Sequence, residues 1–354
     1  MALLWVDKHR PKSLDEMDYH HDLSARLKKL AAQGNQPHML FVGPSGAGKS
    51  TRVYAMLREL YGPGTDMIKV ETKSVAPNPS SPSNTVDIQV VVSNYHLVLT
   101  PSDVGNKDRA VVMQLIKEVA AHPPLGNHTF KVVVIEDAGA SNPQAQAPLR
   151  RTMEKYMKTC RIILMCDSAS KIIAPLRSRC CAVRVGAPSN EDVQKVLQKV
   201  ASAESLQLPP AFAFKVAEKS GRDLRRALLL LESAHAQANQ FSKDGILPQE
   251  GWDGAIEKVS KKILQEQSPK CAMEVRGMLY ELLAACLPPD FILKQLMFRL
   301  IADQRDDALK QKAFAAAAHF ESTMRQGSKD IFPSGRLSYC ASWLTSKPQH
   351  SQER

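Results

Sequence analysis

Residues 43–50 read Gly43-Pro44-Ser45-Gly46-Ala47-Gly48-Lys49-Ser50, and this stretch decides the fold of the 354-residue chain. It fits the phosphate-binding pattern G-x-x-x-x-G-K-[ST], in which glycines let backbone N–H groups wrap a phosphate where a Cβ would clash. Lys49 can reach the β- and γ-phosphates of a nucleotide, and the Ser50 hydroxyl can coordinate Mg²⁺. An apolar run at 38–42 precedes the loop and a helical pattern follows it, which is the strand–loop–helix context that the motif requires.

We therefore expect the loop to bind a nucleotide, with the dipole of the following helix directed at the phosphates. The expected cofactors are ATP and Mg²⁺. The loop residues expected to hold them are Gly43, Pro44, Ser45, Gly46, Ala47, Gly48, Lys49, Ser50 and Thr51.

The chain alternates between apolar, β-rich runs and helical patterns up to about residue 187. The β-rich runs lie at 38–42, 67–72, 86–92, 131–136, 161–165 and 181–185, and the helical patterns at 21–33, 48–60, 107–121 and 143–157. Such alternation predicts an α/β domain, 1–187, with a parallel sheet flanked by helices on both faces. Nucleotides bind such sheets at the carboxyl ends of the strands, which is where the phosphate loop lies.

Only helical patterns follow residue 187. Ser189 is a capping residue with acids in the first turn after it, so it predicts the start of a helix. We expect a small helical domain at 188–240, an all-α domain at 241–344 and a disordered polar tail at 345–354. The helices of the small domain are expected at 189–204, 210–219 and 222–238. The all-α domain is expected to begin in a Gly- and Pro-containing linker and to break at 288–289, 327 and 333.

The composition limits the kinds of partner. The net charge of +11 suggests a polyanionic partner, although a basic protein with solvated lysines has the same charge. No apolar run approaches the roughly 20 residues of a membrane span. The seven cysteines show neither a C-x-x-C pair nor zinc spacing, which is typical of buried thiols in a reducing compartment.

Two acids follow the apolar strand expected at 131–135. A phosphate-loop ATPase needs one carboxylate to hold Mg²⁺ and a neighbour that orients the attacking water. Glu136 and Asp137 lie where a buried strand would deliver such a pair. Two solvated acids at the exit of a strand would give the same pattern.

Several further motifs together resemble the boxes of the replication factor C small subunits, the AAA+ proteins of the sliding-clamp loader. The resemblance runs from about residue 4 to about residue 335. The motifs that carry it are Trp5-Val6-Asp7-Lys8-His9-Arg10-Pro11, the loop at 43–50, Ser93-Asn94-Tyr95-His96-Leu97, Arg150-Arg151-Thr152-Met153-Glu154-Lys155-Tyr156 and Arg177-Ser178-Arg179-Cys180. The resemblance implies an AAA+ domain, a helical lid at 188–240 and a C-terminal collar at 241–344 that packs with its counterparts into a pentamer.

The resemblance also implies roles for single residues. Arg179 would be an arginine finger that acts on ATP bound by a neighbouring subunit, a contribution of about 10³–10⁵ in rate where it is known. Arg225 would be the lid arginine that senses this subunit's own nucleotide (the sensor 2 position). Glu136 would hold the metal through water together with Ser50. The residues expected near the adenine are Val6, His9, Arg10 and Pro11.

Three features depart from the family pattern: the acid box, Asp167 and His9. The acid box, usually Asp-Glu-Ala-Asp, reads Glu136-Asp137-Ala138-Gly139, so the metal-binding acid is one methylene longer and the base one shorter. Asp167 stands where a sensor asparagine (sensor 1) is usual, which replaces an amide by an acceptor only and brings an anion toward the γ-phosphate. His9 replaces a tyrosine. We therefore expect tight nucleotide binding with weak hydrolysis, because chemistry demands closer placement than binding does.

DNA contact is expected to be independent of sequence and to run through phosphates. The candidates are Lys107 and Arg109 at the start of one helix, and Arg150 and Arg151 in another. A solvated or ion-paired charge explains each of them equally well.

The resemblance predicts an ATP-binding subunit that helps to open a sliding clamp and load it onto primer-template DNA in replication and repair. Its partners would be other replication factor C subunits, the clamp and the DNA, and its place the nucleus. Two alternatives stay open: a scaffold subunit whose nucleotide site is vestigial, and a P-loop phosphotransferase. A self-contained helicase-type ring is less well supported, because nothing in the sequence suggests pore loops.

Overall fold

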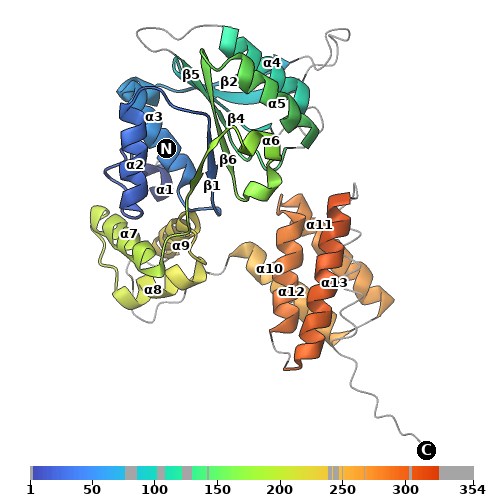
Figure 1. Ribbon diagram of the computed structural model, residues 1–354. Helices are drawn as coiled ribbons and strands as arrows, with labels where there is room; N and C mark the ends of the chain where they lie inside the picture. Colours follow the sequence, from blue (N-terminus) through green and yellow to red (C-terminus); the bar gives the residue numbers. More distant parts are fainter. Residues whose placement is uncertain are drawn as a thin grey trace, which may run out of the picture. The chain divides into compact units, whose positions relative to one another are not determined.

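The computed structural model describes residues 3–75, 86–101, 108–121, 130–141, 143–237, 241, 247–248, 250–266, 268–302 and 305–326. It divides into two compact units, Met1–Pro248 and Gln249–Arg354 (Figure 1). The predicted division of the first unit into 1–187 and 188–240 stays a prediction. Lys107, residues 76–84 and the tail expected at 345–354 lie outside the described residues.

The first unit is built on a seven-stranded sheet with the order β2-β3-β4-β5-β6-β1-β7 (Figure 1). Its strands are β1 (Met39–Val42), β2 (Lys69–Val75), β3 (Val86–Val92), β4 (His96–Leu99), β5 (Lys131–Ile135), β6 (Cys160–Cys166) and β7 (Cys181–Arg184). Neighbouring strands from β4 through β5, β6 and β1 to β7 are parallel. The predicted α/β class is therefore confirmed for most of the sheet.

Strand β3 is the exception, because it pairs antiparallel with both β2 and β4. The lengths of its connections explain this, since a parallel crossover needs about a dozen residues or more. Only three residues, 93–95, separate β3 from β4, and only 76–85 separate β2 from β3. At this edge the sheet departs from the parallel arrangement that the alternation predicted, and β4, a run of four buried residues, was not predicted.

Helices cover both faces of the sheet, as the alternation predicted. They are α2 (His21–Ala32) and α3 (Lys49–Tyr61) on one face, and α4 (Asp108–Ala121), α5 (Pro143–Lys155) and α6 (Ala174–Arg177) on the other (Figure 1). Successive side chains of β1 point to opposite faces. Phe41 accordingly belongs to one apolar core with Val53 of α3, whereas Leu40 belongs to the other with Ile116 and Leu149.

A helical subdomain completes the first unit. Its helices are α7 (Asn190–Ala203), α8 (Pro210–Lys219) and α9 (Leu224–Gln237). The predicted cap is present, since Ser189 and Asp192 form a reciprocal capping box at the start of α7. The short helix α1 (Trp5–Lys8) also packs here, because Trp5 is buried in this core and stacks on His235 at 5.4 Å between ring centroids.

Within its described residues the second unit contains helices and no strand. Its helices are α10 (Gly251–Gln265), α11 (Pro269–Ala284), α12 (Pro289–Ile301) and α13 (Asp307–Gln326). Their apolar faces share one core, which includes Leu279 and Leu296. The expected break at 288–289 is present, whereas those at 327 and 333 lie outside the described residues. Within the part of the chain that the structure describes, no helix is long and apolar enough to cross a membrane.

Candidate nucleotide site

The phosphate loop joins β1 to α3 and requires glycine for steric reasons. A Cβ on Gly43 would lie 1.9 Å from the Val185 carbonyl oxygen, which follows the neighbouring strand β7. Gly46 has φ +65°, and its Cβ would lie 1.8 Å from Oδ1 of Asp223, the residue before α9. The Leu224 N–H also donates to the Gly46 carbonyl at 3.3 Å, so the helical subdomain touches the loop directly. The predicted strand–loop–helix is confirmed.

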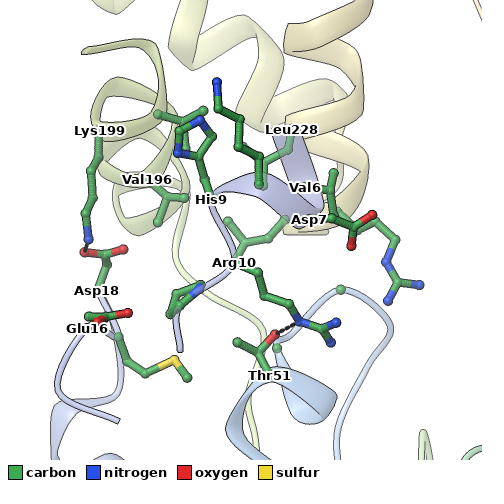
Figure 2. Close-up of a pocket in the computed structure, with 18 of the residues that line it drawn as sticks. Val6, Asp7, His9, Arg10, Glu16, Asp18, Thr51, Val196, Lys199 and Leu228 are labelled. Atoms are coloured by element: carbon green, nitrogen blue, oxygen red, sulfur yellow. Dashed lines mark hydrogen bonds and ion pairs between the residues drawn. The ribbon is translucent and has the colours of Figure 1, made fainter. Parts of the chain in front are cut away.

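A cavity of about 700 Å³ opens beside the loop (Figure 2). The N-terminal segment, the loop, α7 and α9 all contribute to its wall. It brings together predicted site residues that are distant in the sequence: Val6, His9, Arg10, Pro11, Gly46, Gly48, Thr51 and Arg225. Apolar side chains from the two helices, Val196 and Leu228, face the same space (Figure 2). An apolar pocket that continues from a phosphate loop suits a nucleoside base.

Two residues of the N-terminal segment are held in place by contacts on either side of the cavity. Arg10 donates from Nε to the Thr51 hydroxyl at 3.3 Å (Figure 2). Its guanidinium also lies over the Tyr54 ring at 5.3 Å from the centroid. His9 bonds through Nε2 to the Glu204 carboxylate at the end of α7. The segment therefore bridges α3 and the helical subdomain.

Lys49 points back into its own loop. Its Nζ donates to the carbonyl oxygens of Gly43 at 2.5 Å and Pro44 at 3.1 Å. It also forms an ion pair with Oδ1 of Asp167 at 2.6 Å. Asp167 therefore lies next to the loop, and its role at the sensor position stays a prediction.

The two acids of the altered box differ in their surroundings. Glu136 is half-buried at the end of β5, and the Tyr54 hydroxyl donates to its Oε1 at 3.5 Å. Burial, reinforced by the Glu136 charge, raises the pKa of Tyr54 to about 12, so this phenol stays a donor. Asp137 is exposed and has φ +45°. The two side chains do not share one environment.

The oxygens available for a metal are few. No group of three or more His, Cys, Asp or Glu side chains that could hold a metal ion occurs among the described residues. The Ser50 hydroxyl and the Glu136 carboxylate are hard oxygen donors of the kind that Mg²⁺ accepts, and Mg²⁺ usually keeps several waters and takes phosphate oxygens as well. These residues fit a magnesium ion that arrives with the nucleotide.

Arg179 does not reach the loop of its own chain. Its guanidinium pairs with Oε1 of Glu154 on α5 at 2.7 and 2.8 Å and donates to the Pro175 carbonyl at 2.9 Å. Arg150 approaches the same carboxylate at 3.6 Å. The arginine neighbours hold the pKa of Glu154 below its usual range, so this carboxylate stays charged.

The DNA candidates are only partly described. Arg150 and Arg151 are exposed on α5. Arg109 lies in α4, and its side chain is outside the described residues, as Lys107 is altogether. Their role in DNA binding stays a prediction.

Two buried polar residues were not predicted. Arg52 donates to the Ala47 carbonyl at 3.2 Å and to the Tyr19 carbonyl at 2.8 Å, which anchors the loop from beneath. Gln146 donates to the carbonyls of Ala138 and Lys171, so it ties the acid-box turn to the turn after β6. A signal existed for each, because both lie on the apolar faces of amphipathic helices, where a polar residue needs a partner.

These features define a class. A phosphate loop after a central parallel strand, acids after a neighbouring strand and a helical lid against the loop are the parts of a P-loop AAA+ protein. A mutant of RuvB from Thermotoga maritima has a similar fold, with a TM-score of 0.50 at 16% identity, over 76% of this chain and 85% of that one.

Sequence comparisons identify the family. Residues 252–338 match the family "Replication factor C subunit 3, C-terminal domain", 195–236 match "RCF1/5-like, AAA+ ATPase lid domain" and 19–189 match "DNA polymerase III, delta subunit". Replication factor C subunit 3 from Homo sapiens is 45% identical over 332 residues, which cover 93% of this chain and 92% of the human protein. The Arabidopsis thaliana subunit 3 is 43% identical over 93% of this chain and 94% of its own length. The chain belongs to the replication factor C subunit 3 family, and its class is that of the clamp-loader subunits.

Proposed function

We propose that this chain binds ATP with Mg²⁺ and works within a replication factor C hetero-oligomer that opens a sliding clamp and loads it onto primer-template DNA in the nucleus. The observation that carries the proposal is the phosphate loop at the mouth of the 700 Å³ cavity. Fold and family support nucleotide binding in general, and the cavity supports a nucleoside as its occupant.

The nucleotide would bind in two parts. The base would enter the apolar cavity between Val6, Val196 and Leu228, where His9 and Arg10 are already held by their own contacts. Loop N–H groups and Lys49 would hold the phosphates. Bound Mg²⁺ would neutralise phosphate charge, with the Ser50 hydroxyl and, through water, the Glu136 carboxylate as its protein contacts.

Binding would couple the helical subdomain to the sheet. Arg225 lines the cavity from α9, and the N-terminus of α9 contacts Gly46 of the loop. A nucleotide that touches both sides would fix the subdomain against the sheet, since a ligand shifts a conformational equilibrium by its differential contacts.

Weak hydrolysis at this site follows from its acids. Asp137 is exposed, so burial does not fix its orientation toward an attacking water, and Asp167 brings a negative charge to the loop. Transition-state stabilisation in phosphoryl transfer depends on positive charge around the phosphate, which an extra carboxylate opposes.

Arg179 would serve a neighbouring subunit. It is held on the surface by Glu154, separate from the loop of its own chain. Such an arginine can be presented in trans to a γ-phosphate. The second unit, α10–α13, would contribute the collar contacts.

A scaffold subunit with a vestigial site is the second candidate, because Lys49 is already engaged inside the chain. Clamp loading by a reconstituted complex distinguishes the two. Lys49→Ala and Arg179→Ala are introduced one at a time, with Arg58→Ala as a control, since Arg58 is also a surface arginine in an ion pair.

Each outcome has one meaning. Loss of loading with both substitutions, and not with the control, supports full participation in the ATP cycle. Loss with Arg179→Ala alone supports the scaffold candidate with service to the neighbour. Unchanged loading with both would refute the nucleotide-dependent role.

A further inference from the structure

The ammonium group of Lys49 has no hydrogen-bond donor left over. A lysine side chain carries three N–H donors and no acceptor. The Gly43 and Pro44 carbonyls take two of them, and the Asp167 carboxylate takes the third at 2.6 Å. A phosphate can reach this ammonium only by displacing one of the three.

The sheet itself places Asp167 at the loop. Cys166, the last residue of β6, pairs with Val42, the last residue of β1, and the Gly43 N–H donates to the Cys166 carbonyl at 3.2 Å. Asp167 therefore follows its strand beside the first residue of the loop. Its position does not depend on a flexible connection.

The three acceptors differ in charge. The Gly43 and Pro44 carbonyls are neutral parts of the loop backbone, whereas the Asp167 carboxylate is the acceptor that matches a phosphate in charge and geometry. The Lys49 side chain is only 13% exposed, which strengthens its attraction to an anion, while Asp167 is 55% exposed and can swing away. The carboxylate is thus the acceptor that a phosphate would replace.

We propose that Asp167 is an internal competitor for the nucleotide: its carboxylate takes the Lys49 donor that a phosphate would need and so sets the affinity for ATP. This inference rests on the proposed nucleotide site and concerns its regulation. Binding requires the Lys49–Asp167 pair to break, and the displaced carboxylate stays near the incoming phosphates and repels them. The effect is larger for ATP than for ADP, because the γ-phosphate adds charge at the ammonium.

The test is Asp167→Asn in the full chain, which keeps the shape and removes the charge. The affinities for ATP and ADP with Mg²⁺ are measured by titration calorimetry. We expect the Asp167→Asn chain to bind ATP about tenfold more tightly than the wild-type chain, because ATP no longer has to break the ion pair. A partly buried hydrogen bond between charged groups is stronger than an exposed pair and weaker than a fully buried one. ADP should gain less.

The control variant is Asp15→Asn. Asp15 also pairs with a lysine, Lys28, at 2.5 Å, but on the surface of the chain and outside the cavity lining. Its loss removes a comparable ion pair and should leave both affinities unchanged. If Asp15→Asn tightened ATP as much as Asp167→Asn did, the effect would belong to net charge, and the proposal would fail.

Lys49→Ala separates this proposal from the proposed function. If the wild-type chain and Lys49→Ala bind ATP equally well, the proposed location of the nucleotide site is refuted. If Lys49→Ala loses ATP while Asp167→Asn matches or weakens the wild-type affinity, the site stands and the competitor role is refuted.

A second measurement reports the pair directly. Acetylation of Lys49 by acetic anhydride, which transfers one acetyl group to the amine and releases acetate, is followed by mass spectrometry without nucleotide. It should be faster in Asp167→Asn, because the Lys49 amine loses its anionic partner. This rate reports whether the pair exists, whereas the ATP titration reports whether the pair competes with the nucleotide. An unchanged acetylation rate contradicts the proposal.

Discussion

Replacing Gly46 by alanine should destabilise the packing of the helical subdomain against the phosphate loop. The left-handed φ of +65° costs an alanine about 1–2 kcal/mol. The new Cβ would also lie 1.8 Å from Oδ1 and 2.2 Å from Cγ of Asp223, so this side chain must move. Asp223 caps α9 by accepting from the Arg226 N–H at 3.0 Å, and the loss of such a cap costs about 1 kcal/mol. The sum for Gly46→Ala is about 2–3 kcal/mol.

A double-mutant cycle tests this division of the cost between the strained φ of residue 46 and the lost cap of α9. Asp223→Ala alone should cost about 1 kcal/mol, because only the cap is lost. The three atoms nearest to the new Cβ are Oδ1, Cγ and Oδ2 of Asp223, and Asp223→Ala removes all three. The double variant should therefore cost no more than Gly46→Ala alone, about 2–3 kcal/mol, instead of the additive 3–4 kcal/mol.

The assay is guanidinium unfolding followed by the fluorescence of Trp5, which is buried in the subdomain core. Trp252→Phe and Trp343→Phe remove the other tryptophans from the signal. Additive losses in the double variant would refute the reasoning, since they would mean that the alanine at Gly46 never displaces Asp223.

Three further predictions concern stability. The ring of His96 is 2% exposed, and burial lowers its pKa from 6.5 to about 4. As the pH falls, the unfolded chain therefore binds a proton at His96 before the folded chain does. Roughly 3 kcal/mol of stability, fully present above pH 6.5, is lost as the pH falls to 4. His96→Phe should remove this pH dependence of the free energy of unfolding, measured by urea titration. Ser189→Ala should cost about 1 kcal/mol in denaturant, because the Asp192 N–H loses its capping bond of 3.1 Å. In the second unit, Leu279→Ala should cost about 2–5 kcal/mol by thermal unfolding, whereas Met273→Ala, at 64% exposure, should stay within about 0.5 kcal/mol.

Local patterns predicted most of the fold. The helices α3, α5 and α7 begin within one residue of their predicted starts at 48, 143 and 189. Their apolar spacing and caps depend on residues within a turn or two, so one chain is enough to read them. The short strand β4 was missed because four buried residues carry no period of their own.

The residues of the site could also be predicted from the sequence, but their arrangement in space could not. The motifs pointed to Lys49, Asp167 and Arg225 as single residues. Lys49 donates its third hydrogen bond to Asp167 because β1 pairs with β6, and these strands are more than a hundred residues apart in the sequence. The anchoring role of Arg52 similarly depends on Tyr19 from another segment.

The sequence by itself therefore determined the phosphate loop and the identity of the charged residues near it, because these follow from local chemistry and spacing. The resemblance of its motifs to a known family indicated the class of protein. Only the tertiary structure decided which distant residues meet: Lys49 with Asp167, Arg179 with Glu154, and Gly46 with the cap of α9. The physical reason is that strand order and subdomain packing bring distant residues within hydrogen-bond range, and the burial of apolar surface by the whole chain sets both.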